Sequence, residues 1–362
     1  MDVNQERLNS FMGKMIGDVG AAMNASLMLL GDKLGLYQAL AKQGPMNASA
    51  LAKATGTAER YVQEWLSAQA ASGYIEYDSK SGKFSMLPEQ ALALADEDSP
   101  VFLGAVGSLV GATFLDEPKI TDAFKTGKGV GWNKRNECLF CGTARFFRTS
   151  YKHYLVQEWL PALEGVVDKL KKGAVVADVG CGHGVSTRLM AEAFPKSTFY
   201  GFDYHDGSIQ TARQSAREAG LSDRVHFETH SAKTFPAKGY DLVCFFDCLH
   251  DMGDPVGALK HTRSTLADDG TCLLIEPFAN DRLEDNLNPI GRVYYAASTM
   301  ICTPASLDQE VGLALGAQAG EARLREVARQ GGFSRFRRAA ETPARLLHRG
   351  GGTALDRPSS GD

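Results

Sequence analysis

The sequence lacks the features that define several specialised classes of protein. Its 362 residues have no excess of positive charge, because 39 Lys and Arg stand against 43 Asp and Glu, for a net charge of −4. Binding nucleic acid through its phosphates needs a Lys/Arg excess, so a broadly basic nucleic-acid binder is excluded. The 44% hydrophobic and 23% charged residues are ordinary for a folded protein, which excludes intrinsic disorder over most of the chain.

The chain also has no apolar run of the length that crosses a membrane. The longest, residues 101–115, contains Gly, Ser and Thr and is shorter than the roughly 20 apolar residues of a spanning helix, so we expect a buried helix there. The N-terminus has acids at Asp2 and Glu6 where a signal peptide has cationic residues. Seven cysteines is an odd number, and without a secretory signal it predicts reduced thiols in the cytoplasm.

The cysteines give little indication of a metal site. Cys138 and Cys141 have the spacing of zinc ligands, but a structural zinc site normally needs four ligands. No second pair follows, and His153 is the nearest further candidate. We therefore expect buried thiols and no metal.

The first 90 residues have the pattern of a winged helix. Residues 4–43 have apolar residues at helical spacing and predict two helices broken near residues 31–35. Three further elements follow: a short helix capped by Asn47, a second helix capped by Thr57 that runs through Ala71, and a hairpin centred on residues 79–82. Residues 47–83 contain four basic and four acidic side chains, so DNA binding by this segment is not favoured.

From Ala174 onward, short apolar runs alternate with helical segments. The predicted apolar runs cover residues 175–180, 198–203, 225–230, 240–250 and 271–277. This alternation predicts an α/β fold, with a parallel sheet covered by helices on both faces. Residues 334–343 can form a further strand, but residues 344–352 lack the alternation expected of a second one, and we expect residues 350–362 to form a flexible tail.

A glycine-rich turn follows the first of these strands. It reads Asp178-Val-Gly180-Cys-Gly182-His-Gly184 and leads into a helix, whose free backbone N–H groups and close backbone approach suit a ligand. The next strand ends in Asp203, 21 positions after Gly182, a spacing that suits a carboxylate bonding the ribose hydroxyls of a nucleotide cofactor. Asp178 would repel a pyrophosphate but suits a ligand with an ammonium and a sulfonium.

These features together resemble a known family. With the GFD sequence at residues 201–203 and the IxxAR segment at 209–213, residues 176–277 resemble a class I S-adenosylmethionine-dependent methyltransferase. The resemblance implies a Rossmann-like seven-stranded sheet, S-adenosyl-L-methionine as cofactor, and a set of cofactor-binding residues. That set is Asp178, Gly180, Cys181, Gly182, Asp203, Tyr204, Ser231, Ala232 and Asp247. Many relatives have an Asp after the third strand for the adenine amino group; here Ser231, or the backbone alone, takes that position.

The resemblance also implies a catalytic group after the fourth strand. Residues 249–255 resemble the H-D-W-[SD]-D segment of winged-helix small-molecule O-methyltransferases, whose histidine is the general base, although Met252 stands in place of the tryptophan. His250 would take the proton of an acceptor such as a phenol, and Glu276 would orient it. The alternatives are that His250 only braces Asp247 or its loop, or that Asp251 is the acid–base group.

Two segments are candidates for the acceptor pocket, because aromatic and Met side chains suit a planar apolar molecule. They contribute Phe146, Phe147, Arg148, Tyr151, His153, Tyr294, Tyr295 and Met300. We expect a helical and winged-helix dimerisation domain at 1–90, a helical linker contributing to the pocket at 91–165, and the methyltransferase domain at 166–349. The expected activity is methyl transfer to a small molecule at oxygen, in a homodimer; the alternatives are nitrogen or carbon methylation by proximity, or a cofactor-sensing transcriptional regulator.

Overall fold

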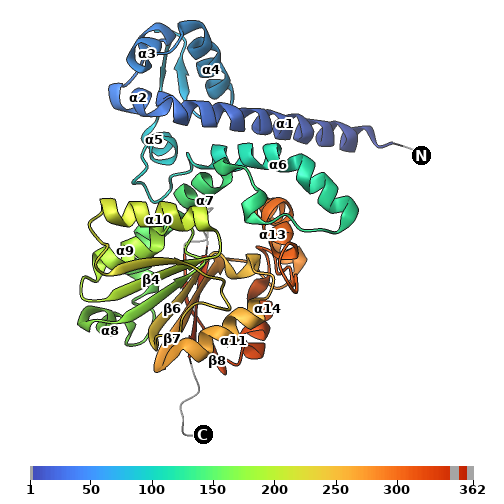
Figure 1. Cartoon of the computed structure of the whole chain (residues 1–362). Helices are drawn as coiled ribbons and strands as arrows, with labels where there is room; N and C mark the ends of the chain where they lie inside the picture. The colour runs from blue at the N-terminus through green and yellow to red at the C-terminus, as the bar shows by residue number, and fades with distance from the viewer. Residues whose placement is uncertain (1–2, 343–349, 357–362) are drawn as a thin grey trace. The chain divides into compact units, whose positions relative to one another are not determined.

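The computed structural model describes residues 3–342 and 350–356 (Figure 1). They form two compact units: Met1–Phe114 with Cys141–Thr149, and Leu115–Phe140 with Ser150–Asp362. This division differs from the predicted boundaries after residues 90 and 165. The intervening helical segment is not a separate linker, because its two long helices, α6 (Val106–Thr126) and α7 (Glu137–Ser150), each contribute to both units.

The first unit has the predicted winged-helix arrangement. Its elements are α1 (Gln5–Lys33), α2 (Leu36–Gln43), α3 (Ala48–Thr55), α4 (Glu59–Ala71), β1 (Glu76–Asp78), β2 (Lys83–Ser85) and α5 (Pro88–Leu94). Gly35, with φ of +66°, turns the chain between α1 and α2 where the helix break was predicted. Asn47 caps α3 by accepting a hydrogen bond from the Ala50 amide, but the predicted cap by Thr57 is wrong, because α4 begins after Ala58 without a side-chain cap.

Helix α6 corrects the prediction of a buried helix at residues 101–115. The helix begins only at Val106, and Phe114 and Leu115 are 65% and 60% exposed. Gly107 instead lies against the backbone of Leu29 in α1, which shows that glycine here permits close helix packing. Within the described ranges, no helix combines the length and hydropathy needed to span a membrane.

The second unit is built on a seven-stranded sheet with the order β5-β4-β3-β6-β7-β9-β8. The strands are β3 (Val175–Val179), β4 (Thr198–Asp203), β5 (Val225–Thr229), β6 (Tyr240–Phe246), β7 (Leu266–Pro277), β8 (Arg335–Glu341) and β9 (Gly350–Asp356). The first five pair in parallel, whereas β9 is antiparallel to both β7 and β8. The predicted seven-stranded Rossmann-like fold is confirmed.

Strand β9 corrects the prediction of a tail from residue 350. Residues 350–356 pair with β7 on one side and β8 on the other, and Leu355 and Ala354 are buried. The strand begins with glycines, which cannot give the alternation of apolar and polar side chains that predicts a strand. Pairing with β7 and β8 therefore determines this strand, and its own sequence pattern does not. Two ranges lie outside the described residues: 343–349 and 357–362. The first contains most of residues 344–352, the segment that lacks the alternation expected of a strand.

Helices cover both faces of this sheet (Figure 1). On one face, α11 (Pro255–Thr265) and α14 (Gly320–Gln330) pack against each other and place Leu259 and Val327 in a core with Phe202 and Phe245. On the other face, Phe227 of β5 reaches the start of α9 (Val185–Ala193) and α10 (Asp206–Glu218). The remaining elements are η1 (Trp132–Lys134), η2 (Tyr151–Trp159), α8 (Val166–Lys172), η3 (Leu249–Asp251), η4 (Leu283–Asn286), α12 (Pro289–Ala297), η5 (Ser298–Cys302) and α13 (Thr303–Leu307).

Candidate active site

Four acidic side chains lie at the carboxyl ends of neighbouring parallel strands in the second unit. Asp178 is in β3, Asp203 ends β4, Asp247 follows β6, and Glu276 is near the end of β7. In an open α/β sheet these strand ends form one edge, where ligands bind. The structure therefore brings the predicted cofactor and catalytic residues of these strands to the same edge.

The glycine turn after β3 has the backbone shape that requires glycine. Gly180 and Gly182 have φ of +76° and +52°. A Cβ on Gly180 would lie 2.7 Å from Sγ of Cys248, whereas nothing lies within 4 Å of the Cβ position of Gly182. The Gly182 amide donates to Oδ2 of Asp203 at 2.9 Å, so the acid at the end of β4 holds the turn in place.

Asp178 is a buried carboxylate that is only partly satisfied. Its Oδ2 accepts hydrogen bonds from the hydroxyls of Ser186 and Thr187, both at 2.6 Å, whereas Oδ1 has no partner among the described residues. Burial raises the pKa of Asp178 to about 6, more than these hydroxyls lower it. A buried acceptor beside the glycine turn fits a cationic group, so the residues present suit the ammonium of S-adenosylmethionine.

The other carboxylate oxygen of Asp203, Oδ1, accepts a hydrogen bond from the His205 amide at 2.8 Å, so the backbone fixes both oxygens. Burial raises the pKa of Asp203, while these backbone donors lower it. Of the other predicted cofactor residues, Cys181 is buried in the turn and Tyr204 is 44% exposed after β4. Ser231 and Ala232 follow β5, and the Ser231 hydroxyl lies 3.0 Å from that of Thr234.

Asp247 has a strained backbone, with φ of +50°. Its amide donates to the Ile275 carbonyl at 2.7 Å, and its Oδ2 accepts from the Tyr151 hydroxyl at 3.1 Å. Burial, together with the nearby negative charge of Glu276, raises the pKa of Asp247 to about 8. Non-glycine residues in this region of conformational space are concentrated at functional sites, which makes Asp247 a candidate for contact with a ligand.

His250 and Glu276 form a buried pair, each about 4% exposed. The Nδ1 atom of His250 is hydrogen-bonded to Oε2 of Glu276, and Oε1 of Glu276 accepts from the Leu249 amide at 2.9 Å. Burial by itself lowers the pKa of His250, but Glu276 and Asp251 outweigh it and raise that pKa well above 6.5. In its neutral form, an imidazole whose Nδ1–H is held by a carboxylate presents Nε2 as its proton acceptor.

Asp251 is held beside this pair by residues that the sequence did not indicate. Its Oδ1 lies 3.2 Å from Nε2 of His250, and its Oδ2 accepts from Nε1 of Trp132 at 3.2 Å. Cys302 completes the group, with Sγ within 4.8 Å of the ligand atoms of His250 and Asp251. Trp132 precedes Asp251 by 119 residues, and no local pattern signals such a contact.

The predicted acceptor-pocket residues fall into both units. In the second unit, Tyr151 and Tyr294 are buried, and a further three are half-buried: His153, Tyr295 and Met300. Phe146, Phe147 and Arg148 belong to the first unit, where Arg148 pairs with Glu97 at 3.4 Å. A pocket shared by all these residues stays a prediction.

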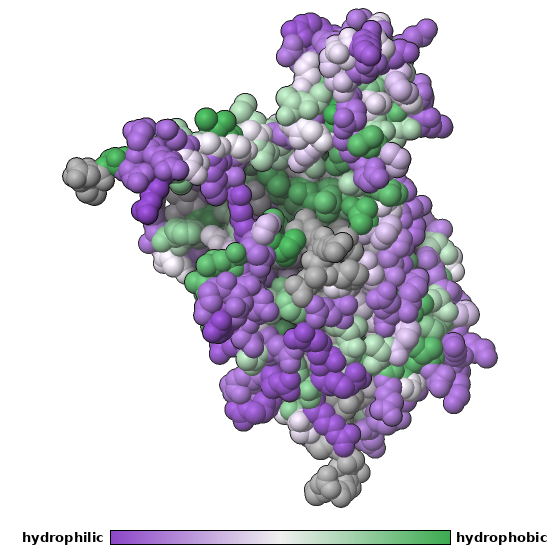
Figure 2. Space-filling model, turned by 180° about the vertical axis from the view of Figure 1, so that it is seen from behind, coloured by the Kyte–Doolittle hydropathy of each residue, from purple (hydrophilic) through white to green (hydrophobic). Residues whose placement is uncertain are grey.

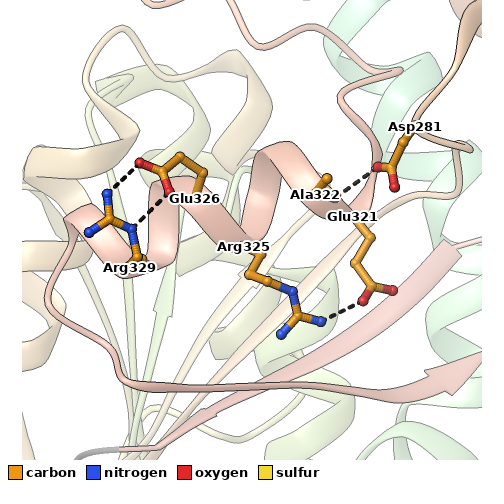
Figure 3. Close-up of a pocket in the computed structure, with 6 residues that line it drawn as sticks. All are labelled: Asp281, Glu321, Ala322, Arg325, Glu326 and Arg329. Atoms are coloured by element: carbon orange, nitrogen blue, oxygen red, sulfur yellow. Dashed lines mark hydrogen bonds and ion pairs between the residues drawn. The ribbon is translucent and has the colours of Figure 1, made fainter.

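A cavity of about 270 Å³ on α14 lies outside this group of residues (Figure 3). Its charged side chains are already paired, Arg325 with Glu321 and Arg329 with Glu326, both at 2.7 Å, and Asp281 caps the Ala322 amide. Pairs of this kind on an exposed helix are typical of a solvated surface. We assign no ligand to it.

Comparison with known families identifies both units. Residues 170–330 match the family described as a methyltransferase domain, and residues 22–96 match the Rv2258c-like winged HTH domain. Acetylserotonin O-methyltransferase of Mus musculus is 26% identical over 350 residues, covering 91% of this chain and 86% of the mouse protein. An uncharacterized Synechococcus protein is 30% identical over 98 residues, but these are only 23% of its length and 26% of this chain.

Solved structures agree in fold along nearly the whole chain. A putative O-methyltransferase from Nostoc punctiforme has a TM-score of 0.71 at 17% identity, covering 95% of this chain and 98% of its own. Human N-acetylserotonin methyltransferase in complex with SAM has a TM-score of 0.68 at 16% identity, covering 99% and 98%. These structures show the fold, and the two family matches identify the chain as a class I S-adenosylmethionine-dependent methyltransferase with an N-terminal winged-helix domain.

Proposed function

We propose that this enzyme transfers the methyl group of S-adenosylmethionine to a hydroxyl oxygen of a small aromatic molecule, with His250 as general base. The observation that carries the proposal is the buried pair of His250 and Glu276, which lies at the same sheet edge as Asp178 and Asp203. The mouse relative supports oxygen as the acceptor atom, because it is named an O-methyltransferase.

The roles of the residues follow from their positions. When bound, S-adenosylmethionine supplies a methyl group on a positively charged sulfur. Asp178 offers its free Oδ1 to the ammonium of the methionine part, and Asp203 offers its remaining acceptor positions to the ribose hydroxyls. Both are carboxylates fixed by hydrogen bonds from the chain, so little ordering is required when the cofactor binds.

His250 has the chemistry of the proton acceptor. A phenol has a pKa near 10 and reacts far better as its anion, so a neighbouring imidazole that takes the proton promotes methyl transfer. Glu276 holds Nδ1–H, which leaves Nε2 for the acceptor and stabilises the imidazolium once the proton has moved. The rest of the rate enhancement comes from holding acceptor oxygen and methyl carbon in line in a site without water.

The proposal is tested by methylation assays on the purified chain. Formation of S-adenosylhomocysteine is measured against a panel of phenols, amines and carboxylates, because the acceptor class separates oxygen from nitrogen chemistry. We expect turnover with at least one phenol. Turnover with amines alone, at a rate that His250→Ala does not change, would favour nitrogen methylation by proximity.

Two alternatives remain, one for the catalytic residue and one for the function. In the first, Asp251 carries the acid–base role in place of His250, since its carboxylate is buried beside Nε2. A cofactor-sensing transcriptional regulator would bind DNA through the winged helix, but the charges of residues 47–83 sum to zero. Salt-dependent binding to promoter DNA, without turnover of any acceptor, would favour the regulator.

We further propose a homodimer in the cytoplasm, formed through α1. The N-terminal part of this helix has exposed apolar residues at helical spacing. Figure 2 shows hydrophobic residues among hydrophilic ones on this face of the molecule. They are Leu8, Phe11, Met12, Met15, Ile16, Val19 and Met23. A face of this kind is typical of an interaction site, and the same stripe on a second copy is its natural complement. All seven cysteines are free thiols, in keeping with a reducing compartment.

A further inference from the structure

Beside the catalytic pair, the structure brings together three different metal-ligating side chains. Nε2 of His250, a carboxylate oxygen of Asp251 and Sγ of Cys302 all lie within 4.8 Å of one another, and all three residues are buried. A tetrahedral zinc site with bonds near 2.0–2.3 Å places its ligand atoms about 3.5 Å apart. Small side-chain rotations therefore bring these three atoms to bonding distance of one ion.

A second observation concerns the carboxylate of this cluster. Oδ1 of Asp251 is buried and has no hydrogen-bond partner within the described ranges, and its contact with Nε2 of His250 at 3.2 Å is an ion pair only while the imidazole is protonated. A buried carboxylate oxygen without a donor is costly, and native proteins usually satisfy such a group with a donor, an ion or water. A metal ion between these two atoms would satisfy both.

The surrounding residues hold the ligands as the outer shell of a metal site does. Ligating histidines commonly donate their second ring nitrogen to a carboxylate, as Nδ1 of His250 does to Glu276. Nε1 of Trp132 donates to Oδ2 of Asp251, which leaves Oδ1 for the ion. The buried guanidinium of Arg135 lies 3.9 Å from Oδ2 of Asp116, and its positive charge also acts on Asp251.

The ligand types select the metal. A thiol combined with an imidazole and one carboxylate suits zinc, whereas magnesium and calcium prefer a shell of oxygen atoms alone. Three protein ligands leave a fourth position open, as in sites where zinc also binds water or a small molecule. On binding, the S–H bond of Cys302 breaks, its proton passes to solvent, and an S–Zn bond forms.

We propose that His250, Asp251 and Cys302 form a binding site for Zn²⁺, and that zinc bound there inhibits methyl transfer. The inhibition rests on the proposed function, because the ion occupies the Nε2 atom that would otherwise accept the proton of the acceptor. The binding does not rest on it. No local sequence pattern indicates this site, because Cys302 lies more than 50 residues after the two other ligands.

Binding is tested directly on the full chain with Co²⁺ as a spectroscopic substitute for zinc. We expect one equivalent of Co²⁺ to produce a thiolate-to-metal charge-transfer band that zinc abolishes by competition. Cys302→Ser should remove the band and weaken zinc binding, measured by calorimetry, by at least about 10-fold. The matched control is Cys141→Ser, because this exposed thiol lies outside the cluster and its loss should leave the band unchanged.

Two further measurements keep the test decisive. If Cys302→Ser does not fold, Trp132→Phe, which removes the hydrogen bond to Asp251, should weaken zinc binding by roughly 10–100-fold. Absence of the band in the wild type, or its persistence in a folded Cys302→Ser variant, would overturn the site. Zinc should also inhibit any methylation by the wild type more strongly than by Cys302→Ser, each relative to its own metal-free rate. Zinc binding without any methylation contradicts only the proposed function; methylation without zinc binding contradicts only this inference.

Discussion

His250 and Glu276 are joined by a hydrogen bond between Nδ1 and Oε2 that connects the segment after β6 with the end of β7. Neither side chain is more than about 5% exposed, so the pair is shielded from water. Glu276 also accepts from the Leu249 amide, which fixes the carboxylate relative to the helical turn that carries His250. The geometry thus orients the imidazole through the fold itself, before any acceptor binds.

Replacing His250 should remove the proton acceptor without removing the cofactor site. We expect His250→Ala to lower kcat for a phenol at least about 10²-fold, the lower end of what general-base catalysis supplies. The measurement is steady-state formation of S-adenosylhomocysteine, with calorimetry to verify that the cofactor still binds. A rate within a factor of about 3 of the wild type would exclude the general-base role.

Glu276 is a positioning residue, and its effect should depend on His250. In Glu276→Gln the imidazole loses its charged partner, so we expect kcat to fall between the wild-type and His250→Ala values while KM changes little. The informative measurement is the double variant, because two residues that act as one unit are not additive. If the losses from the two single variants simply multiplied in the double variant, Glu276 would act independently of His250.

Asp203 should contribute to cofactor affinity through the ribose. Hydrogen bonds to a charged acceptor contribute about 1.5–3 kcal/mol each, so Asp203→Ala should raise the Kd of S-adenosylmethionine at least about 10-fold. Asp203→Asn keeps an acceptor for the Gly182 amide and separates loss of charge from disturbance of the turn. Asp223, an exposed residue of the same unit, supplies the control Asp223→Ala. An unchanged Kd in both Asp203 variants would mean that the ribose lies elsewhere.

Asp178 should make the cofactor-free protein less stable as pH rises. Its pKa is about 6 in the folded chain against 3.8 for the ordinary carboxyl, so folding favours the protonated form. Below pH 4 the carboxyl is protonated in both states and does not lower the free energy of unfolding. Between pH 4 and 6 this free energy falls by about 1.4 kcal/mol per pH unit, up to about 3 kcal/mol in all. Above pH 6 it falls no further on account of Asp178. Asp178→Asn removes this dependence.

Denaturant unfolding of the wild type and Asp178→Asn at several pH values measures the difference directly. Comparing the two proteins cancels the other titrating groups, which they share. The wild type should lose stability relative to Asp178→Asn as pH rises from 4 to 6. A difference that stays constant, or that changes in the opposite direction, would contradict the burial of an unsatisfied carboxylate.

The apolar stripe of α1 should hold two chains together. We expect light scattering during size-exclusion chromatography to give the mass of two 39.0 kDa chains. Ile16 lies in the stripe and is 69% exposed in the single chain, so a second chain can cover it. Ile16→Glu places a charge there and should yield a monomer. Ser10→Glu adds the same charge on the opposite side of the helix and should leave the dimer intact. A wild type that elutes as a monomer would contradict this assembly.

Local patterns predicted much of the cofactor side of the site. The turn from Asp178 to Gly184 and the acid Asp203 could be predicted because strand, glycine turn and helix follow one another in the chain. The winged helix was predictable for the same reason, since its helices and hairpin are consecutive.

Features that depend on distant contacts could not be predicted. Strand β9 begins with glycines and is defined by pairing with β7 and β8, and the contact of Trp132 with Asp251 joins residues 119 positions apart. The strained backbone of Asp247 and its bond to Tyr151 also depend on packing between separate elements. Sequence patterns report local preferences, whereas these features arise only when the elements are assembled.

We expect this enzyme to transfer a methyl group to a hydroxyl oxygen with His250 as base. The most direct test incubates the full chain with S-adenosylmethionine and the panel of phenols, amines and carboxylates, and measures both S-adenosylhomocysteine and the methylated product by mass spectrometry. We expect an O-methylated phenol from the wild type and at least about 10²-fold slower formation by His250→Ala. Methylated amines alone, or an O-methylated product formed equally fast by His250→Ala, would contradict it.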